Sequence, residues 1–517
     1  MTPVRRLGAG SSVQPDHSTH RYVRRRQILW LLPSLPLSAL AVLTRGYPTT
    51  GSDTGIFLSV AGRLLAGDKL YRDVFDNKDP LFYFSQSFAL WVGGWRGPFL
   101  MDVAWLIVAS VSTHLLLRLV TGDLVIAVFG QLLYPLLLTG FHYYAADSET
   151  PALSLLPLFA YLVYRGRPRV AGLVAAATLL LRLNLLPVVA AIAVGRFLFA
   201  RTSRPGRELL VLLSSTAAGV GVIFLILAWR GEGHAYVRTL WQNVDYSSRL
   251  LRFHDLPSGV HGHLLVVWQK MPTAGWLQLG ALFVTVAGAV FLSADAPVRV
   301  RSQLVVITAA IFSGTMIALA TTALWDHHLQ LLAFPIVCGA TLTLECMRTL
   351  LSPRVGQVVS VGAVGCFFVA ASLLMTPPSI WKLRQWGASP DTAVSDGLHA
   401  AAEQEKQPRT PLSYFHLGEN DETGSGAFLD GSFRLSCPRF HQYSFLAPEQ
   451  LRQTMRCVER TRPHLIAVTP SFTYHRSGGR FGAWNDFVLA GREYLRSHCE
   501  QVVATVDVRV YRCRAIR

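Results

Sequence analysis

The densest group of ionisable residues near the start of the chain is the segment GSDTGIFLSVAGRLLAGDKLYRDVFDNKDPLFYF, residues 51–84. It contains five carboxylates and two of the five lysines of the whole chain. A carboxylate can take the proton of an attacking hydroxyl group, and a lysine ammonium can neutralise a phosphate oxygen. Apolar residues at helical spacing run through the same segment, so we interpret it as a folded loop with a catalytic role.

Asp53 and Lys78 are the main candidates within this segment. Asp53 suits a general base, although an aspartate in front of an apolar helical run can also serve only as its N-cap. Lys78 suits a phosphate contact, and arginine outnumbers lysine 43 to 5 in this chain, which favours a specific need for a lysine. The alternative is a loop lysine paired with Asp76 or Asp79. Tyr71 and Asp76 are further substrate-binding candidates that we expect to shape the loop.

Three later segments carry the remaining candidate substrate-binding residues. Asp147 and Glu149 bind an acceptor, orient Asp53 or cap the helix that follows them. Arg182 joins two short apolar segments, where it binds phosphate or extends to the membrane interface as an anchor. We expect His327 or His328 to contact a headgroup or donor. Neighbouring helical residues point about 100° apart, so this pair does not imply a shared metal ion.

The composition is that of a polytopic α-helical membrane protein. Of the 517 residues 51% are hydrophobic and only 15% charged, with a mean hydropathy of +0.35. About eleven apolar stretches approach or reach the length that crosses a ~30 Å hydrocarbon core. They lie near 27–44, 99–120, 124–140, 151–164, 170–181, 185–199, 209–229, 274–292, 303–324, 329–347 and 355–375. The net charge of +17 is spread over short loops and forms no basic stripe, so we expect no nucleic-acid partner.

The arginines also predict the orientation in the cytoplasmic membrane. Six of them precede the first span, which places the N-terminal tail 1–26 inside the cell. The transmembrane part 27–375 then has its first outer loop at 45–98, and the C-terminal domain 376–517 lies outside. The apolar segment 81–95 must be interfacial or re-entrant for this orientation. Nearly all acidic and histidine clusters share the outer face, including a long loop at 230–273 whose three histidines we expect at its surface: His254, His261 and His263.

The C-terminal 142 residues read as a small extracytoplasmic α/β domain. Strands are predicted at 412–417 and 464–469, a helix at 448–460 and a closing hairpin around 502–511. Four cysteines of this domain are candidates for disulfides in an oxidising compartment: Cys437, Cys457, Cys499 and Cys513. Proximity in the sequence favours pairing the first two and the last two, and a metal site is the lesser alternative.

The first outer loop resembles that of the GT-C glycosyltransferases. Asp53 follows the first span, and Gly67-x-x-Leu70-Tyr71-x-Asp73 and Asp76-x-Lys78-x-Pro80-Leu81 come after it. The likeness is greatest to the branch that contains the protein O-mannosyltransferases and the lipid A aminoarabinose transferase. It extends to the acidic segment at Asp147, the basic turn at Arg182, the histidine-bearing turn and the outer C-terminal domain.

This resemblance implies transfer of a sugar from a polyprenyl-phosphate donor to a hydroxyl of an envelope glycan, lipid or protein, with inversion and with Asp53 as base. Many relatives have Asp-Glu where this chain has Asp53-Thr54, so no second carboxylate adjoins Asp53 and we expect neither a divalent metal nor another cofactor. The alternatives are a flippase or exporter of lipid-linked sugars and a noncatalytic envelope scaffold. A transporter should show repeated halves and charges near mid-membrane, and we find no convincing repeat.

Overall fold

The structure of the chain is a computed structural model. It describes residues 32, 34–45, 53–140, 146–199, 204–253, 298–321, 326–350, 355, 393–404, 411–418, 425–429, 431–439, 442, 446–475 and 481–514. The expected span 274–292, nearly all of 355–375, and His254, His261 and His263 lie outside these residues.

The described helical part begins with α2 (Ser34–Arg45), α3 (Asp53–Leu65) and α4 (Pro80–Gly93), followed by the short turn η1 (Gly94–Arg96). The bundle continues with α5 (Gly97–Thr121), α6 (Leu124–Gly140), α7 (Glu149–Tyr164), α8 (Pro168–Leu181), η2 (Leu183–Leu185), α9 (Leu186–Phe199) and α10 (Pro205–Trp229). After α11 (Gly233–Phe253) come α14 (Val298–Thr321), η3 (Asp326–Leu332) and α15 (Ala333–Leu350).

Helix α5 illustrates why these segments form where the hydropathy predicts them. Its 25 residues extend about 37 Å, enough to cross a hydrocarbon core. Pro98 occupies its first turn, and Gly122 ends it in the left-handed conformation (φ 70°) with its N–H bonded to the carbonyl of Arg118. Within the described residues three helical stretches are long and apolar enough to span a membrane: 97–121, 205–229 and 328–345. The expected total of about eleven spans stays a prediction.

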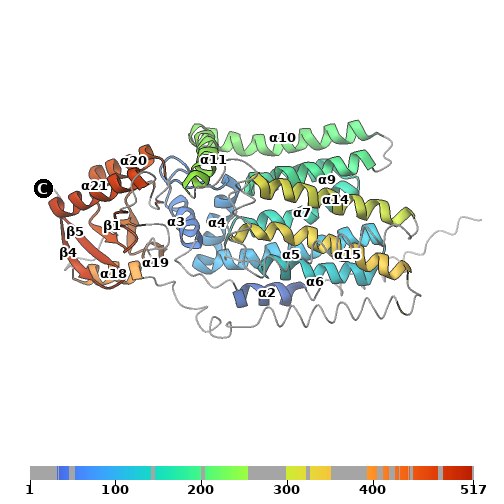
Figure 1. The fold of residues 1–517 in the computed structure, drawn as a ribbon, viewed down its shortest axis with the longest axis horizontal. Coiled ribbons are helices and arrows are strands. Elements are labelled where there is room, and N and C mark those ends of the chain that lie inside the picture. Colours follow the sequence, from blue (N-terminus) through green and yellow to red (C-terminus); the bar gives the residue numbers. More distant parts are fainter. Residues whose placement is uncertain are drawn as a thin grey trace, which may run out of the picture.

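The long helices α5 to α10, α14 and α15 run side by side, and the C-terminal sheet lies at one end of them (Figure 1). Small residues allow the closest approaches. A side chain at Gly172 in α8 would come within 2.5 Å of the carbonyl oxygen of Leu212 in α10. Close backbone packing through glycine is the usual way to join helices in lipid, where burial of apolar surface gives no advantage.

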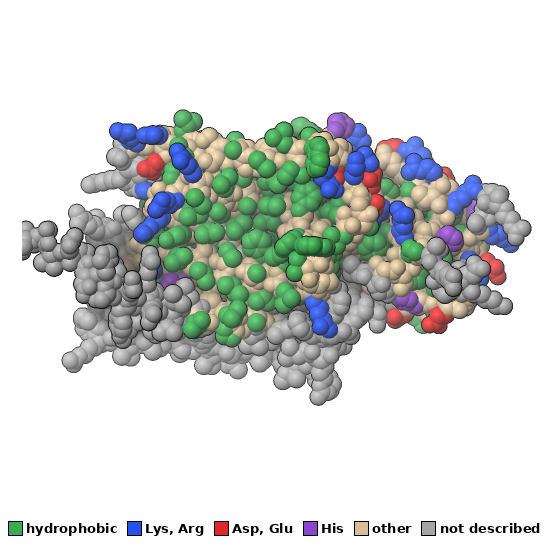
Figure 2. Space-filling model, turned by 180° about the vertical axis from the view of Figure 1, so that it is seen from behind, with side chains coloured by type: hydrophobic (Ala, Val, Ile, Leu, Met, Phe, Trp, Pro, Cys, Tyr) green, Lys and Arg blue, Asp and Glu red, His purple; other side chains and the backbone are tan. Residues whose placement is uncertain are grey.

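The surface of the bundle supports a membrane location. Figure 2 shows hydrophobic side chains over the middle of the helical part, with lysine and arginine at the two ends of this zone. Exposed apolar residues on α10 include Leu210, Leu225 and Trp229, the last 88% exposed. Such surface is costly in water and favourable in lipid.

Helix α11 occupies a segment that the sequence indicated only as a loop. It lies between the bundle and the C-terminal part (Figure 1). Its buried residue Tyr236 bonds to Asp79 of the first outer loop, whereas Trp241 is 73% exposed. The helix is amphipathic and therefore carries no long apolar run.

The C-terminal part contains a five-stranded sheet in the order β2-β1-β3-β5-β4. The strands are β1 (Leu412–Leu417), β2 (Phe433–Leu435), β3 (Leu465–Val468), β4 (Cys499–Ala504) and β5 (Arg509–Cys513). Strand β1 is parallel to β2 and β3, and β5 is antiparallel to β3 and β4. Both predicted central strands and the closing hairpin are therefore present.

Helices cover both faces of this sheet. They are α18 (Ala393–Glu403), α19 (Ser425–Leu429), α20 (Pro448–Thr461) and α21 (Gly482–His498). Tyr414 packs with Phe433 on one face, and its neighbour Phe415 joins the cluster around Trp484 of α21 on the other. Disulfides join Cys437 to Cys457 and Cys499 to Cys513.

Candidate functional site

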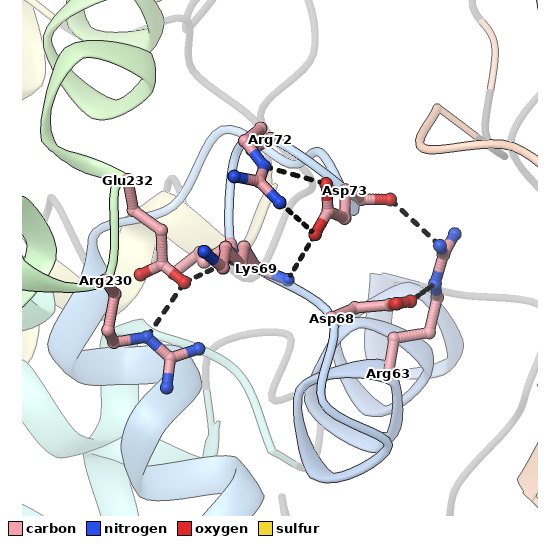
Figure 3. A network of polar contacts seen from close by, with 8 residues as sticks. Arg63, Asp68, Lys69, Arg72, Asp73, Arg230 and Glu232 are labelled. Atoms are coloured by element: carbon pink, nitrogen blue, oxygen red, sulfur yellow. Dashed lines mark hydrogen bonds and ion pairs between the residues drawn. The ribbon is translucent and has the colours of Figure 1, made fainter.

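The first outer loop is a compact folded unit held by its own charged residues (Figure 3). Arg63 pairs with Asp68 and also donates to the carbonyl oxygen of Asp73 at 2.9 Å. The side chain of Asp73 accepts from Arg72 and from the N–H of Lys69. These contacts close the chain on itself directly after α3, so they fix the direction in which the rest of the loop leaves the helix.

Glu232, at the junction of α10 and α11, ties this loop to the bundle. Its carboxylate accepts from the N–H of Leu70 at 3.1 Å and from Arg230 at 2.8 Å, and the side chain is fully buried. Figure 3 shows this pair beside Lys69. The loop therefore has two anchors, one on α3 and one on the bundle.

Asp53, Asp76 and Lys78 come together at the start of α3. Asp53 is the first residue of that helix and is half-buried, and Asp76 is only 4% exposed and accepts a hydrogen bond from the hydroxyl of Tyr83. The ammonium of Lys78 lies 5.4 Å from the ring centre of Phe57. Burial raises the pKa of Asp76 to about 7, the charge of Lys78 opposes the shift and the charge of Asp53 adds to it.

Tyr71 holds the backbone beside Lys78. Its hydroxyl donates to the carbonyl oxygen of Lys78 at 2.7 Å, and its ring stacks on Tyr236 of α11 at 5.1 Å between centres. The backbone of Tyr71 is in the left-handed region (φ 64°), which costs energy for a residue with a side chain. The hydroxyl hydrogen bond and the ring stacking stabilise that conformation. In this structure Tyr71 therefore contacts the main chain of Lys78 and not its ammonium group.

Asp79 connects the first outer loop to the turn that carries Arg182. Its two oxygens accept hydrogen bonds of 2.8 Å, one from the N–H of Leu183 and one from the hydroxyl of Tyr236. Burial raises its pKa to about 6, while these two bonds and the charges of Arg182 and Lys78 lower it. In the sequence Asp79 appeared only as a possible partner of Lys78. Its position directly before Pro80 marks a helix start and gave no sign of the distant contact.

Arg182 is buried and paired with Glu149. Its Nη1 forms the ion pair with Glu149 and donates to Ser148 at 2.8 Å, and His328 Nε2 lies 3.7 Å from the same carboxylate. The Nε atom of Arg182 is buried and has no hydrogen-bond partner among the described residues. Arg182 is therefore held by other side chains of the protein, and its two predicted roles, phosphate contact and interfacial anchor, both stay predictions. The side chains of Asp326 and His327 lie outside the described residues.

Asp147 lies beside this pair. Its Oδ1 accepts from the N–H of Thr150 and so caps α7, and its Oδ2 accepts from Gln330 at 3.3 Å. Burial raises the pKa of Asp147 well above its usual value, and the charges of Glu149 and Asp102 raise it further. The hydrogen bond to Thr150 fits the capping alternative for Asp147, and its other predicted roles stay predictions. Asp147 also lies near Glu149, the partner of Arg182.

Asp102 is a site residue that the sequence reading passed over. It is fully buried in α5, and its Oδ2 accepts from the N–H of Ala146 at 2.7 Å, next to Asp147. The available signal was a lone aspartate inside a predicted membrane span, which is costly unless it serves the protein. No group of three possible metal ligands occurs among the residues that the structure describes.

Comparisons with known proteins were made at three levels. No family model matches the chain, and no curated protein matches it either. Among solved structures, ArnT from Cupriavidus metallidurans bound to undecaprenyl phosphate superposes with a TM-score of 0.55 at 12% identity, over 94% of this chain and 97% of ArnT. The same protein in its apo state gives 0.53 at 13% identity, over 96% and 98% of the two chains.

A third structure is the arabinofuranosyltransferase AftD from Mycobacteria, with a TM-score of 0.50 and 12% identity over 95% of this chain and 40% of AftD. ArnT and AftD are GT-C proteins, so the resemblance seen in the first outer loop is confirmed at the level of the fold. At such low identity the likeness establishes the architecture alone.

Proposed function

We propose, from this GT-C fold and its buried loop charges, that the protein is a membrane glycosyltransferase. It transfers a sugar from a polyprenyl-phosphate donor to a hydroxyl group of an envelope glycan, lipid or protein on the extracytoplasmic side. The observation that carries the proposal is the meeting of Lys78 and Arg182 around Asp79, beside Asp53 and Asp76. The fold likeness to ArnT bound to undecaprenyl phosphate supports a polyprenyl lipid as the donor.

The proposed reaction is a single displacement with inversion. The acceptor oxygen attacks the anomeric carbon, the bond from that carbon to the phosphate oxygen breaks, and polyprenyl phosphate leaves. Asp53 takes the proton of the attacking hydroxyl, because it is less buried than the neighbouring carboxylate Asp76 and therefore more open to an acceptor. Asp76 lies behind it, held by Tyr83.

Two cations serve the leaving phosphate in this proposal. Lys78 contributes a compact charge. Arg182, whose Nη1 is fixed by Glu149, contributes its Nε, which has no hydrogen-bond partner within the described part of the chain. His328 orients Glu149, and Tyr71 orients Lys78. Because these side chains neutralise the charge of the leaving phosphate, we propose that transfer needs no divalent cation. Activity should therefore survive a strong chelator.

The proposed orientation places this group of residues outside the cell. The turn at Arg182 follows the C-terminal end of helix α8. At the N-terminal end of the same helix lie Arg165, Arg167 and Arg169. Arginine-rich short loops favour the cytoplasmic side. Accessibility labelling of single cysteines placed at Arg167 and at exposed Val506 of the C-terminal part tests this, with labelling from outside expected only at 506.

The test of function is a transfer assay with purified protein, a panel of radiolabelled polyprenyl-phosphate sugars and membrane-extract acceptors. Asp53→Asn should abolish transfer while the protein still folds and binds undecaprenyl phosphate. Asp245→Asn, the same change at an exposed ion pair on α11, is the matched control and should retain activity. Undiminished transfer by Asp53→Asn would remove that residue as the base. No transfer with any donor, together with movement of lipid-linked sugar across liposomes, would favour the flippase.

A further inference from the structure

A short segment of the C-terminal part, Cys437 to Arg439, lies directly against the first outer loop. The carbonyl oxygen of Cys437 accepts from Arg63 Nη1 at 2.8 Å, and that of Pro438 accepts from the N–H of Phe75 at 2.9 Å. The guanidinium of Arg439 lies 3.7 Å from the ring centre of Phe75. Three successive residues thus contact Arg63, at the end of α3, and Phe75, further along the loop.

The sheet holds this segment firmly from behind. It follows β2, and both the N–H and the hydroxyl of Ser436 donate to the carbonyl oxygen of Tyr414 in β1. The disulfide from Cys437 to Cys457 ties the segment to α20 as well. The backbone that carries Arg439 is therefore fixed to the sheet and to α20.

Arg439 brings a positive charge to Asp76, the residue that follows Phe75. Other groups that face Asp76 are Asp53 from α3, Tyr83 from α4, and Tyr71 and Lys78 from the loop itself. Of these groups Asp53 is negative and Lys78 is positive. Arg439 adds a second positive charge, from a residue more than 360 positions away in the chain. An arginine keeps its charge at any working pH.

We propose that Arg439 is a positioning residue of the active site: by stacking on Phe75 it fixes the Phe75–Asp76 backbone, and by its charge it favours the ionised form of Asp76 next to Asp53. The C-terminal part would then complete the site as well as cover it. The catalytic consequence rests on the proposed glycosyl transfer, whereas the contact and its effect on Asp76 do not.

The first test needs no substrate. Infrared difference spectroscopy of the full-length protein, titrated with acid, follows the carbonyl band of protonated carboxyl groups, and the band missing in Asp76→Asn identifies Asp76. In the wild type we expect its midpoint near pH 7. In Arg439→Gln the midpoint should rise by a fraction of a pH unit. An opposite charge near a carboxylate lowers its pKa, and the charge of Arg439 lowers that of Asp76 less than the charge of Lys78 does.

Two further variants make the outcome decisive. Arg439→Lys keeps the charge and should return the midpoint most of the way to the wild-type value, and Arg452→Gln, which removes an exposed arginine of α20, should leave it unchanged. Phe75→Leu removes the ring under the guanidinium and should raise the midpoint in the same direction; it decides the question if Arg439→Gln does not fold. An unchanged midpoint in every folded variant would overturn the proposal.

The transfer assay then separates this inference from the proposed function. If Asp76 must be ionised for transfer, the acidic limb of the rate profile should shift to higher pH in Arg439→Gln by the same amount as the infrared midpoint, and raising the pH should restore the rate. A shifted midpoint in a protein that transfers no sugar would leave the role of Arg439 standing and refute only the glycosyltransferase. A loss of rate at every pH, with an unshifted midpoint, would indicate a purely structural contact.

Discussion

Breaking the ion pair between Arg182 and Glu149 should destabilise the protein far more than breaking an exposed pair. The side chains are 9% and 1% exposed, so neither charge can recover its hydration when its partner is removed. Removing one partner of a buried pair costs roughly 3–5 kcal/mol, whereas exposed pairs contribute about 0–1 kcal/mol. In Glu149→Gln the amide oxygen can still accept a neutral hydrogen bond, which returns about 1 kcal/mol. We therefore expect a loss of about 2–4 kcal/mol.

The reverse change, Arg182→Met, should have a cost of similar size, about 2–4 kcal/mol, because it leaves a buried carboxylate. Glu149 keeps the hydrogen bond from Ser148, and His328 at 3.7 Å can take up a proton to balance the charge. The double variant Glu149→Gln with Arg182→Met should then lose less than the sum of the two single variants, by about 2 kcal/mol, because each change alone leaves the other group unpaired.

The assay is equilibrium unfolding in mixed micelles with increasing dodecyl sulfate, applied to the wild type, both single variants and the double variant. Asp245→Asn and Arg249→Gln, with their double variant, form the matched cycle on an exposed i,i+4 pair of α11, where the coupling should be about 0.5 kcal/mol or less. Additive losses at Arg182 and Glu149, or losses no larger than those of the exposed pair, would refute the reasoning that burial makes this pair costly to break.

Three other outcomes are expected. First, the folded-state pKa of Asp76 is raised above the unfolded value of about 4, so the ionised carboxylate destabilises the native state. As the pH rises from 4 to 7, the stability of the wild type should therefore fall relative to that of Asp76→Asn. Thermal unfolding across that range measures this difference. Second, Tyr236→Phe removes one hydrogen bond to Asp79 and should weaken binding of undecaprenyl phosphate several-fold with little loss of stability, measured by titration of labelled lipid against the Tyr474→Phe control. Third, the double change Cys437→Ser with Cys457→Ser opens a bridge between residues 20 apart and should lower the unfolding free energy of the C-terminal part by about 3 kcal/mol, seen as earlier proteolysis there.

The helices of the bundle were predictable because lipid-spanning segments must be long, apolar and internally hydrogen-bonded. The stretch predicted at 99–120 is α5 (Gly97–Thr121), and that at 124–140 is α6 (Leu124–Gly140). Alternation and turn residues likewise located β1 at its observed bounds. Helix α11 escaped because its apolar residues lie on one face only, which gives a low mean hydropathy.

The candidate site was predictable in its residue types but not in its contacts. Asp53, Lys78 and Arg182 stood out by charge in apolar surroundings. The structure places Asp53 and Lys78 around Asp76, and Lys78 and Arg182 around Asp79. The bond from Asp79 to Leu183 and the stacking of Arg439 on Phe75 join residues more than 100 and more than 360 positions apart. Contacts of that range depend on how helices and the sheet pack, and a single sequence carries no record of them.

The two disulfides of the C-terminal part each join a cysteine to the next cysteine in the chain. If this part is exported, as proposed, the cysteines emerge from the translocation channel in the order in which they pair. An oxidase acting on the first pair as it appears would make the native bridge before the third cysteine arrives. Secretion hosts that have an oxidase but no disulfide isomerase should therefore yield correctly bridged protein. Reordering the segments by circular permutation would remove that advantage.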